Sequence, residues 1–563
     1  MTYDSALRQV GEFGTYQKRL YVLLCLPFIT CAMQVMVTVF ILGVPDHRCA
    51  VSENDTFAIQ SPQHQLMVNR SVPPGEFPLL SPYSKCNLYS YHSNNDSNPE
   101  DSRFIRKCSK WVYEKTDFHS TFVTEDDLVC HKKSYVTHTV MSFMAGFMVG
   151  ALVSGVVADS LGRKKGLLLS LALHIIPNII VTFATDLLTF MCLRFLAGAS
   201  VGGLLAVSFT MIMELVGPSY RMMAGIALEQ FWAVGALILA LLAYLIRDWR
   251  YLNLAVSLPA LLFIPYICII PESSRWLLSR GREKEAEDIL RQAGRVNKRK
   301  LPEKLFDYED VFEDDACIPV LQLCVNPKLL FRSVIIFFNW MVVSMLFFGL
   351  SLNVGNLGGD IYLNFLLQSL AEVVGYGIPL IALKSLGRKP VYVGSLLIGG
   401  AACILTIFPV LYGDASVHWS VIGLSVIGKI GSSTAFATIY LFSAELFPTV
   451  VRNSAMGTSS LCARIGGMVS PYIAVINQVV GGDLGVAMPL LVFGLFAFVA
   501  GLLALTLPET KGRHLPESIK DSVQYTDQTK DILRIDVTEA SQPLTEDTAL
   551  TSVANGVTIS DKK

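Results

Sequence analysis

Three ionisable side chains lie deep within long apolar runs of this 563-residue chain. They are Glu229, Glu372 and Arg464, and a charge at the centre of a membrane helix costs about 2.5–3.5 kcal/mol on insertion scales. Such residues commonly line a substrate or ion pathway, although a carboxylate can also serve only to hydrogen-bond a neighbouring helix. We therefore predict a central site that can pair with charged groups of both signs.

Aromatic side chains accompany these charges. Trp232 follows Glu229 in the same run, and Trp340 and Phe347 share one helix face because they lie two turns apart. An aromatic cage beside a carboxylate suits a quaternary ammonium through cation–π attraction, whereas ordinary packing explains any single membrane aromatic equally well. The candidate substrate-binding residues are Glu229, Gln230, Trp232, Trp340, Phe347, Glu372, Tyr440 and Arg464.

Two further cations, Arg194 and Lys429, occupy matching positions in the fourth and tenth apolar runs. We expect both to be structural and to bond backbone carbonyls where helices meet. Neither is therefore included among the substrate-binding candidates.

Charged motifs at the ends of apolar runs occur twice, in the same order, about 230 residues apart. Segment 159–165, Asp-Ser-Leu-Gly-Arg-Lys-Lys, returns as 384–390, Lys-Ser-Leu-Gly-Arg-Lys-Pro, in which Lys384 replaces the acid. A Glu and an Arg separated by six residues also return, as does a Pro-Glu-Ser or Pro-Glu-Thr triplet. The charged members are Asp159, Arg163, Glu214, Arg221, Glu272, Arg388, Glu445, Arg452 and Glu509. This repeat implies two homologous membrane bundles, an organisation typical of transporters.

A carrier that works by alternating access must close one side before it opens the other. We predict that these repeated charges form a gating latch on the cytoplasmic side, with the second-half set as the opposite wall. Partly desolvated ion pairs suit this role because they hold more strongly than exposed pairs and can still be broken. The alternative is that the arginines only set the membrane topology.

The elements that must position these residues are membrane helices. Hydrophobic residues make up 52% of the chain and charged residues 16%, against about 25% charged residues in soluble domains. The mean hydropathy is +0.48. The first apolar run is too long for a signal peptide. We predict an all-α polytopic membrane protein of two six-helix bundles, with spans at 20–44, 135–158, 166–184, 187–211, 222–246, 250–270, 331–353, 361–383, 391–412, 419–444, 454–478 and 485–507.

Basic residues gather in the short loops after even-numbered spans, so the positive-inside rule predicts that both termini are cytoplasmic. A helix is expected within the linker at 282–291, either as a lid that holds the bundles together or as a solvated connection. The expected parts are a cytoplasmic N-terminus at 1–19, a first bundle at 20–270, a cytoplasmic linker with short helices at 271–330, a second bundle at 331–507 and a mostly disordered cytoplasmic tail at 508–563.

The long loop at 45–134 is external in this topology. It contains three glycosylation sequons, at Asn54, Asn69 and Asn95. It also contains four cysteines, which predict two disulfides in an oxidising compartment and leave three pairings open. The four cysteines are Cys49, Cys86, Cys108 and Cys130.

Enzyme chemistry has no support in the sequence. We find no phosphate-binding loop, metal-ligand cluster or nucleophile elbow, so we expect no catalytic residues, no metal and no cofactor. The net charge of −1, without a basic domain, gives no reason to expect a nucleic-acid partner.

The motifs resemble those of the major facilitator superfamily, whose loop signature stands here as Gly155-x3-Asp159-x2-Gly162-Arg163-Lys164. More closely, the chain resembles the organic cation, carnitine and organic anion transporter family, over about residues 8–512. The specific segments are 10–17 (Val-Gly-Glu-Phe-Gly-Thr-Tyr-Gln), 123–130 (Val-Thr-Glu-Asp-Asp-Leu-Val-Cys), 271–276 (Pro-Glu-Ser-Ser-Arg-Trp), 444–453 (Ala-Glu-Leu-Phe-Pro-Thr-Val-Val-Arg-Asn) and 508–512 (Pro-Glu-Thr-Lys-Gly).

The resemblance implies a polyspecific plasma-membrane carrier of small organic ions, with the lipid bilayer as its surroundings. Organic cation transporters of the family carry an acid at the position of Arg464, whereas carnitine-type and organic anion transporters carry arginine there. Together with Glu229, this favours organic cations and zwitterions such as carnitine or a betaine. The alternatives are an organic anion exchanger of the same family and a transporter-like membrane sensor. Uniport, sodium coupling and exchange are all compatible with these residues.

Overall fold

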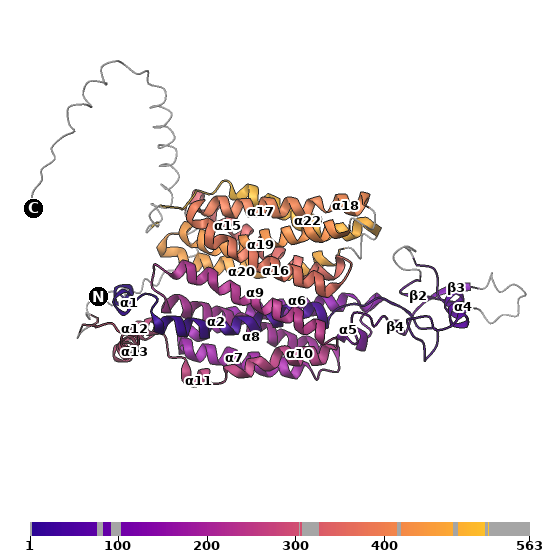
Figure 1. Cartoon of the computed structure of the whole chain (residues 1–563), viewed down its shortest axis with the longest axis horizontal. Coiled ribbons are helices and arrows are strands. Elements are labelled where there is room, and N and C mark those ends of the chain that lie inside the picture. The colour runs from indigo at the N-terminus through magenta and orange to yellow at the C-terminus, as the bar shows by residue number, and fades with distance from the viewer. Residues whose placement is uncertain are drawn as a thin grey trace, which may run out of the picture.

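The computed structural model describes residues 3–75, 83–91, 103–302, 305–306, 326–413, 418–476, 482–512 and 516. Two helical bundles lie side by side, the first drawn in indigo to magenta and the second in orange to yellow (Figure 1). A lobe with short strands extends from one end, which we call the loop end. The N-terminal helix and two linker helices lie at the opposite end, which we call the linker end (Figure 1). The predicted all-α arrangement of two bundles is confirmed.

The first bundle follows the predicted spans, although the first span is divided into α2 and α3 and the sixth into three segments. The span expected as one helix at 250–270 is divided into α10, a 3-10 segment and α11, because Pro259 and Pro265 each lack the amide hydrogen that a continuous helix needs. The elements are α2 (Thr15–Met36), α3 (Thr38–Ile41), α6 (Ser134–Leu161), α7 (Arg163–Val181), α8 (Leu187–Leu215), α9 (Arg221–Leu245), α10 (Trp249–Ser257), η2 (Leu258–Phe263) and α11 (Tyr266–Ile269).

The second bundle repeats this order. Its elements are α15 (Pro327–Leu352), η3 (Asn353–Asn356), α16 (Ile361–Ser385), α17 (Arg388–Leu405), α18 (Ile407–Tyr412), α19 (His418–Leu446), α20 (Thr449–Ala474) and α22 (Gly482–Ala504). Among the described residues, 11 helices are long and apolar enough to cross a membrane. The predicted span at 454–478 corresponds to α20, which has 26 residues but several polar ones, including Thr458, Ser459 and Arg464.

The lobe at the loop end is held by two small sheets and two disulfides. Strand β1 (His47–Cys49) pairs with β4 (Trp111–Tyr113), and β2 (Asn87–Tyr91) pairs with β3 (Arg103–Lys107), both antiparallel. The helices α4 (Pro62–Ser71) and α5 (Phe122–Glu125) complete the lobe. The two expected disulfides are present, and the pairing is Cys49–Cys108 and Cys86–Cys130.

A buried ion pair fixes the start of this lobe. The Arg48 guanidinium lies 2.7 Å from the Asp55 carboxylate, and both side chains are almost fully buried. Although burial opposes ionisation, the hydrogen bonds from Arg48 hold the pKa of Asp55 below its ordinary value. The sequons at Asn54 and Asn69 are exposed, whereas Asn95 lies outside the described residues, so glycosylation stays a prediction.

At the linker end, α1 (Tyr3–Val10), α12 (Ser274–Ser279) and α13 (Glu283–Val296) cover the first bundle. Helix α13 begins one residue into the expected stretch at 282–291 and packs against α1 through Leu290, Ala293, Leu7 and Val10. The Asn297 side chain, at the end of α13, accepts from the Tyr16 amide and donates to the Val10 carbonyl. The linker helices are therefore attached to the first bundle.

Two helices of the first bundle approach each other through glycines. A Cβ added to Gly198 of α8 would lie 2.0 Å from the Phe143 carbonyl oxygen of α6, and one added to Gly146 would lie 2.0 Å from the Phe195 carbonyl oxygen. Because hydrocarbon provides no hydrophobic force between helices, this close backbone contact stabilises the bundle by van der Waals packing.

We predict that Gly198→Ala reduces cell-surface expression strongly, because its Cβ can only be accommodated if the two backbones move apart. The matched control is Gly394→Ala in α17, where an added Cβ meets nothing within 4 Å. Surface biotinylation measures both variants. Equal surface levels of the two proteins would contradict the assigned helix contact.

Candidate functional site

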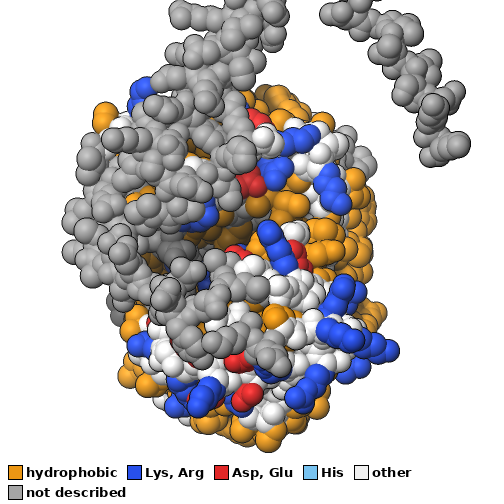
Figure 2. Space-filling model, turned by 90° about the vertical axis from the view of Figure 1, so that its left-hand side faces the viewer, with side chains coloured by type: hydrophobic (Ala, Val, Ile, Leu, Met, Phe, Trp, Pro, Cys, Tyr) orange, Lys and Arg blue, Asp and Glu red, His pale blue; other side chains and the backbone are white. Residues whose placement is uncertain are grey.

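A cavity of about 940 Å³ lies between the two bundles at the linker end. The first bundle contributes Phe209, Met222 and Glu229 to its wall, and the second contributes Tyr440 and Met456. Figure 2 views this end and shows a hollow with hydrophobic side chains inside and Lys, Arg, Asp and Glu side chains around it. Glu229 lies about two turns inside α9, so the cavity reaches well into the bundle.

The predicted aromatics belong to one group that crosses between the bundles. The ring centroid of Trp232 on α9 lies 6.4 Å from the ring centroid of Phe347 on α15, and the ring distances that follow are also between centroids. The Phe347 ring lies 5.2 Å from Phe436, which lies 5.7 Å from Tyr440. Tyr440 meets Trp340 edge-on at 4.4 Å. We call these five residues the aromatic group. Phe436, which joins the two parts, was missed because one more Phe in an apolar run carries no signal.

The predicted acid Glu372 forms an ion pair with Lys429. The Lys429 Nζ atom lies 2.9 Å from Glu372 Oε1, and both side chains are buried. Lys429 also donates to the Phe347 carbonyl at 3.0 Å and to the Ser351 hydroxyl at 2.7 Å. The expectation that Lys429 only bonds carbonyls was therefore incomplete, because the sequence does not show which helix faces it.

The other cation expected to be structural, Arg194, is fully buried. Its guanidinium donates to the Thr38 hydroxyl and lies 4.4 Å from the centre of the Phe143 ring. Arg194 thus contacts a side-chain hydroxyl and a ring where backbone carbonyls were expected. Its Nε and Nη1 atoms have no hydrogen-bond partner among the described residues.

Arg464 and Gln230 connect the bundles near the cavity. The Arg464 guanidinium of α20 lies 3.8 Å from the centre of the Phe147 ring of α6. Its buried Nε atom has no hydrogen-bond partner within the described part of the chain. Gln230 Nε2 of α9 donates to the Val373 carbonyl of α16 at 3.3 Å. These contacts follow the two main helix pairings between the bundles, α9 with α16 and α6 with α20.

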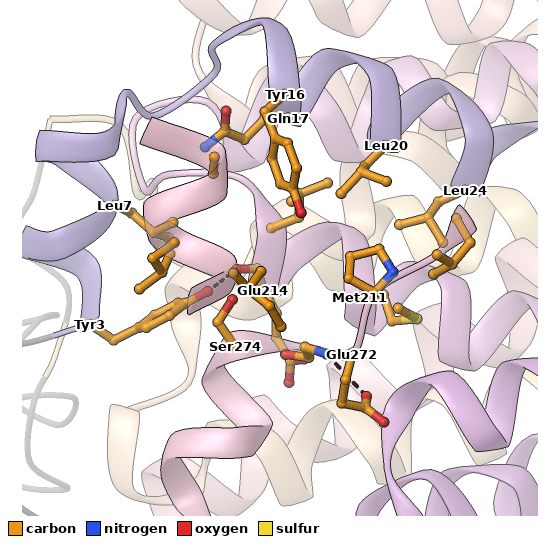
Figure 3. Close-up of a pocket in the computed structure, with 17 residues that line it drawn as sticks. Tyr3, Leu7, Tyr16, Gln17, Leu20, Leu24, Met211, Glu214, Glu272 and Ser274 are labelled. Carbon is orange, nitrogen blue, oxygen red and sulfur yellow. Dashed lines mark hydrogen bonds between the residues drawn. The ribbon is translucent and has the colours of Figure 1, made fainter. Parts of the chain in front are cut away.

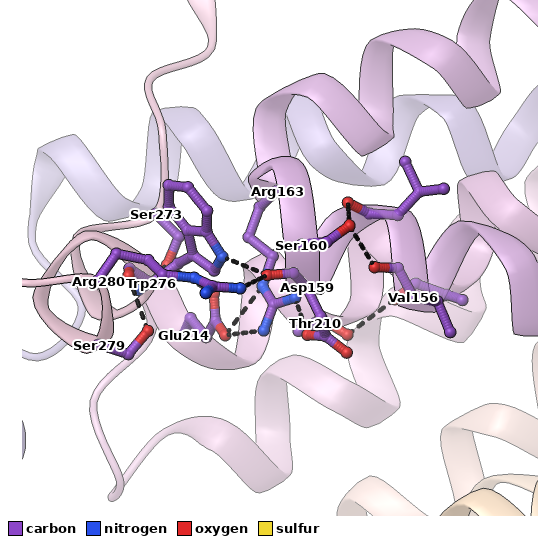
Figure 4. Close-up of polar contacts among 12 residues, drawn as sticks. Val156, Asp159, Ser160, Arg163, Thr210, Glu214, Ser273, Trp276, Ser279 and Arg280 are labelled. Atoms are coloured by element: carbon purple, nitrogen blue, oxygen red, sulfur yellow. Dashed lines mark hydrogen bonds and ion pairs between the residues drawn. The ribbon is translucent and has the colours of Figure 1, made fainter. Parts of the chain in front are cut away.

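The repeated charges of the first bundle surround the Glu214 carboxylate. Arg163 Nη2 lies 3.2 Å from Glu214 Oε1, and the Ser273 hydroxyl donates to Glu214 Oε2 at 2.6 Å. Arg163 also pairs with Asp159, whose carbonyl accepts from the Trp276 indole at 2.9 Å (Figure 4). The Glu214 carboxylate, at the end of α8, thereby joins the start of α7 and the segment before α12.

The same cluster returns in the second bundle around Glu445. Arg388 Nη2 lies 2.9 Å from Glu445 Oε1, and the Thr510 hydroxyl donates to Glu445 Oε2. In both bundles the Glu of the triplet accepts from amides at the start of an earlier helix. Glu272 accepts from the Lys164 amide of α7 at 2.9 Å, and Glu509 accepts from the Arg388 and Lys389 amides of α17 at 3.0 Å.

The bundles differ in how the following arginine is held. Arg221 Nη2 lies 2.7 Å from the Asp4 carboxylate of α1, and the Tyr3 hydroxyl donates to the Glu214 carbonyl at 2.9 Å. Figure 3 shows Tyr3 and Leu7 of α1 beside a small cavity, close to Glu214. The equivalent Arg452 donates only to the Phe447 carbonyl, and its Nη2 atom has no partner within the described ranges.

The gating candidates therefore lie together at the linker end, but their ion pairs join residues of the same bundle. Asp159, Arg163, Arg221 and Arg452 line the cavity mouth, which is open between the two sets. A latch across the bundles stays a prediction, and it would apply to the conformation in which this mouth is closed.

Aromatic contacts separate the cavity from the loop end. Phe40 of α3 stacks on Tyr362 of α16 at 5.7 Å and meets Phe365 at 5.0 Å. The Tyr362 hydroxyl also donates to the Asp117 carbonyl at 2.5 Å. A second cavity of about 650 Å³, lined by Asp117 and Phe118 among others, lies at the loop end.

The family model and the relatives that match this chain are all described as transporters or solute carriers. Residues 81–520 match the family model described as "Sugar (and other) transporter". The organic cation transporter protein of Drosophila melanogaster is 36% identical over 93% of this chain and 95% of its own length. Solute carrier family 22 member 13 of Homo sapiens is 34% identical over 92% of this chain and 93% of its own length.

A solved structure shares the fold. The partially occluded, inward-open structure of the xylose transporter XylE from E. coli superposes with a TM-score of 0.53, covering 68% of this chain and 90% of that protein at 18% identity.

We predict that Glu214→Gln and Glu445→Gln lower the apparent melting temperature of the purified protein by several degrees each, because each removes the partly buried charged partner of an arginine. The first substitution leaves Arg163 only the exposed Asp159, and the second leaves Arg388 no carboxylate in ion-pair contact among the described residues. The control is Glu287→Gln, which removes a more exposed pair with Arg291 on one turn of α13 and should have little effect. Three equal shifts would show that the clusters do not hold the helix ends.

Proposed function

Because this chain belongs to the sugar (and other) transporter family, and within it to the organic cation, carnitine and organic anion transporters of the major facilitator superfamily, we propose that it carries organic cations and zwitterions across the plasma membrane by alternating access. It is a multi-pass membrane transporter of organic ions. The finer assignment, to molecules such as carnitine or a betaine, rests on the central side chains.

The observation that carries this assignment is that one acid and one base near the cavity attract each other electrostatically, yet neither forms an ion pair within 4.0 Å among the described residues. Glu229 lines the cavity and has no cation within ion-pair distance among the described residues. Arg464 has a buried Nε atom without a hydrogen-bond partner. A carboxylate can pair with a substrate ammonium and a guanidinium with a substrate carboxylate, so the two suit a molecule that carries both charges.

The aromatic group supports an ammonium in particular. Tyr440 faces the same cavity as Glu229, and Trp232 connects the group to the first bundle. Aromatic faces attract a quaternary ammonium by cation–π interaction, worth about 0.5–2 kcal/mol depending on desolvation. We therefore assign the ammonium end of the substrate to Glu229 and the aromatic group, and the carboxylate end to Arg464.

The open cavity defines the conformation that we propose. The basic loops predict that the linker end is cytoplasmic, so the structure would represent the inward-open state, with the contacts of Phe40, Tyr362 and Phe365 as the closed outer side. Rocking of the bundles would close the linker end around the repeated charges.

An organic anion exchanger is the second candidate. Arg464 favours it, because a guanidinium with a free donor also suits a simple carboxylate. Glu229 opposes it, because an unpaired carboxylate in the cavity would repel an anion.

Uptake of labelled substrates into oocytes tests the proposal. The panel contains carnitine, ergothioneine, tetraethylammonium and an organic anion, each with and without sodium. We expect saturable carnitine uptake above that of water-injected oocytes. We also expect unlabelled carnitine inside the oocyte to accelerate the uptake of labelled carnitine from outside. Entry of tetraethylammonium without carnitine would refute the zwitterion assignment, and entry of no compound would refute the carrier.

We predict that Arg464→Asp shifts selectivity from carnitine toward tetraethylammonium by at least about tenfold in the ratio of uptake rates, because the carboxylate loses its partner and meets a like charge. Arg464→Lys is the control and should retain part of the carnitine preference. Unchanged selectivity of the Asp variant, at normal surface expression, would show that Arg464 does not contact substrate.

A further inference from the structure

The ion pair between Lys429 and Glu372 has a feature that simple helix packing does not require. Both side chains are buried, with exposed fractions of 0% and 3%. Lys429 uses its three donors fully, on Glu372 Oε1, the Phe347 carbonyl and the Ser351 hydroxyl. Glu372 does not, because its buried Oε2 atom has no hydrogen-bond partner among the described residues.

The pair lies directly against the aromatic group. Lys429 Nζ is 3.6 Å from the centre of the Phe347 ring, which is in contact with Trp232 and Phe436. Tyr376, one turn after Glu372 on α16, places its ring 6.4 Å from that of Phe347. The charge of Glu372 therefore changes the electrostatic potential at the place where the substrate ammonium is proposed to bind.

The two bundles show that the acid is not needed to hold the cation. Arg194, at the matching place in the first bundle, lies over Phe143 as Lys429 lies over Phe347. Arg194 bonds the Thr38 hydroxyl and has no carboxylate within ion-pair distance in the described part of the chain. A buried cation over a ring thus belongs to the shared scaffold, whereas its pairing with an acid occurs only in the second bundle.

We propose that Lys429 is a specificity-determining residue that cancels the charge of Glu372, so that Glu229 is the one unpaired acid presented to the substrate ammonium. This inference rests on the proposed transport of organic ions. Without Lys429, two carboxylates would face the aromatic group, and the site would favour a simple cation over a zwitterion, whose own carboxylate would be repelled. With Lys429 in place, Glu372 Oε2 remains an acceptor for a neutral donor such as a substrate hydroxyl.

The test compares uptake of tetraethylammonium and carnitine by cells that express single and double variants. We expect Lys429→Gln to raise the ratio of tetraethylammonium to carnitine uptake by roughly tenfold or more, because Glu372 becomes an unpaired acid. We expect Glu372→Gln to lower the same ratio by a similar factor, because Lys429 then carries an unpaired positive charge. The two variants move selectivity in opposite directions, so either one suffices if the other does not reach the surface.

The double variant Lys429→Gln with Glu372→Gln supplies the internal control. Because both charges are removed together, its ratio should return to within about threefold of the wild-type value, which makes the two substitutions strongly non-additive. Lys110→Gln, in the exposed external loop, is the matched lysine substitution and should leave the ratio unchanged.

A purely structural ion pair predicts a different result. Both single variants would then lose uptake of the two substrates in parallel with surface expression, at a constant ratio, and that result would overturn the proposal. Failure of the proposed function is distinguishable, since the wild-type protein would then transport neither substrate.

Discussion

The structure depends on one carboxylate in each bundle, Glu214 in the first and Glu445 in the second. Each accepts from an arginine at the start of an earlier helix, α7 or α17, and from a hydroxyl after the sixth span of its bundle. Three chain segments that are far apart in sequence are thereby joined at one partly buried point, where charged hydrogen bonds are strong. We expect each bundle to move as one body, so that the relative motion occurs at the surface between the bundles.

That surface combines packing with unsatisfied charge. Glycine contacts and buried aromatics fix the helices inside a bundle, whereas the bundles meet along α9 with α16 and α6 with α20, through contacts such as Arg464 on Phe147 and Gln230 on Val373. A substrate bound at a central site between the bundles would contact side chains of both. The charged groups there differ in their pairing: Glu372 forms an ion pair with Lys429 through Oε1, while Glu229 has no ion pair within 4.0 Å among the described residues.

The sequence predicted which charged residues are important better than it predicted which residues they contact. The repeat identified Glu214, Arg163 and Ser273 together with their echoes, but it could not show that they pair within a bundle, because a repeat is compatible with either arrangement. Glu372 was recognised by the cost of a buried charge, whereas its partner Lys429 was assigned to backbone carbonyls, since the facing helix is set by tertiary packing. Pro259 and Pro265 could have signalled the break in the sixth span. The disulfide pairing had no signal in sequence.

The central claim is that two bodies held by these clusters move about a shared site. Electron–electron distance measurements between spin labels test it most directly, with one pair of labels at Met222 and Met456 across the cavity. A second pair joins Met222 to Ser279 of the linker helix α12, which is attached to the first bundle, after replacement of the exposed Cys192 and Cys268. We predict that substrate and outward-favouring conditions populate a shorter Met222–Met456 distance while the Met222–Ser279 distance stays constant. A constant distance across the cavity, or equal changes in both pairs, would contradict it.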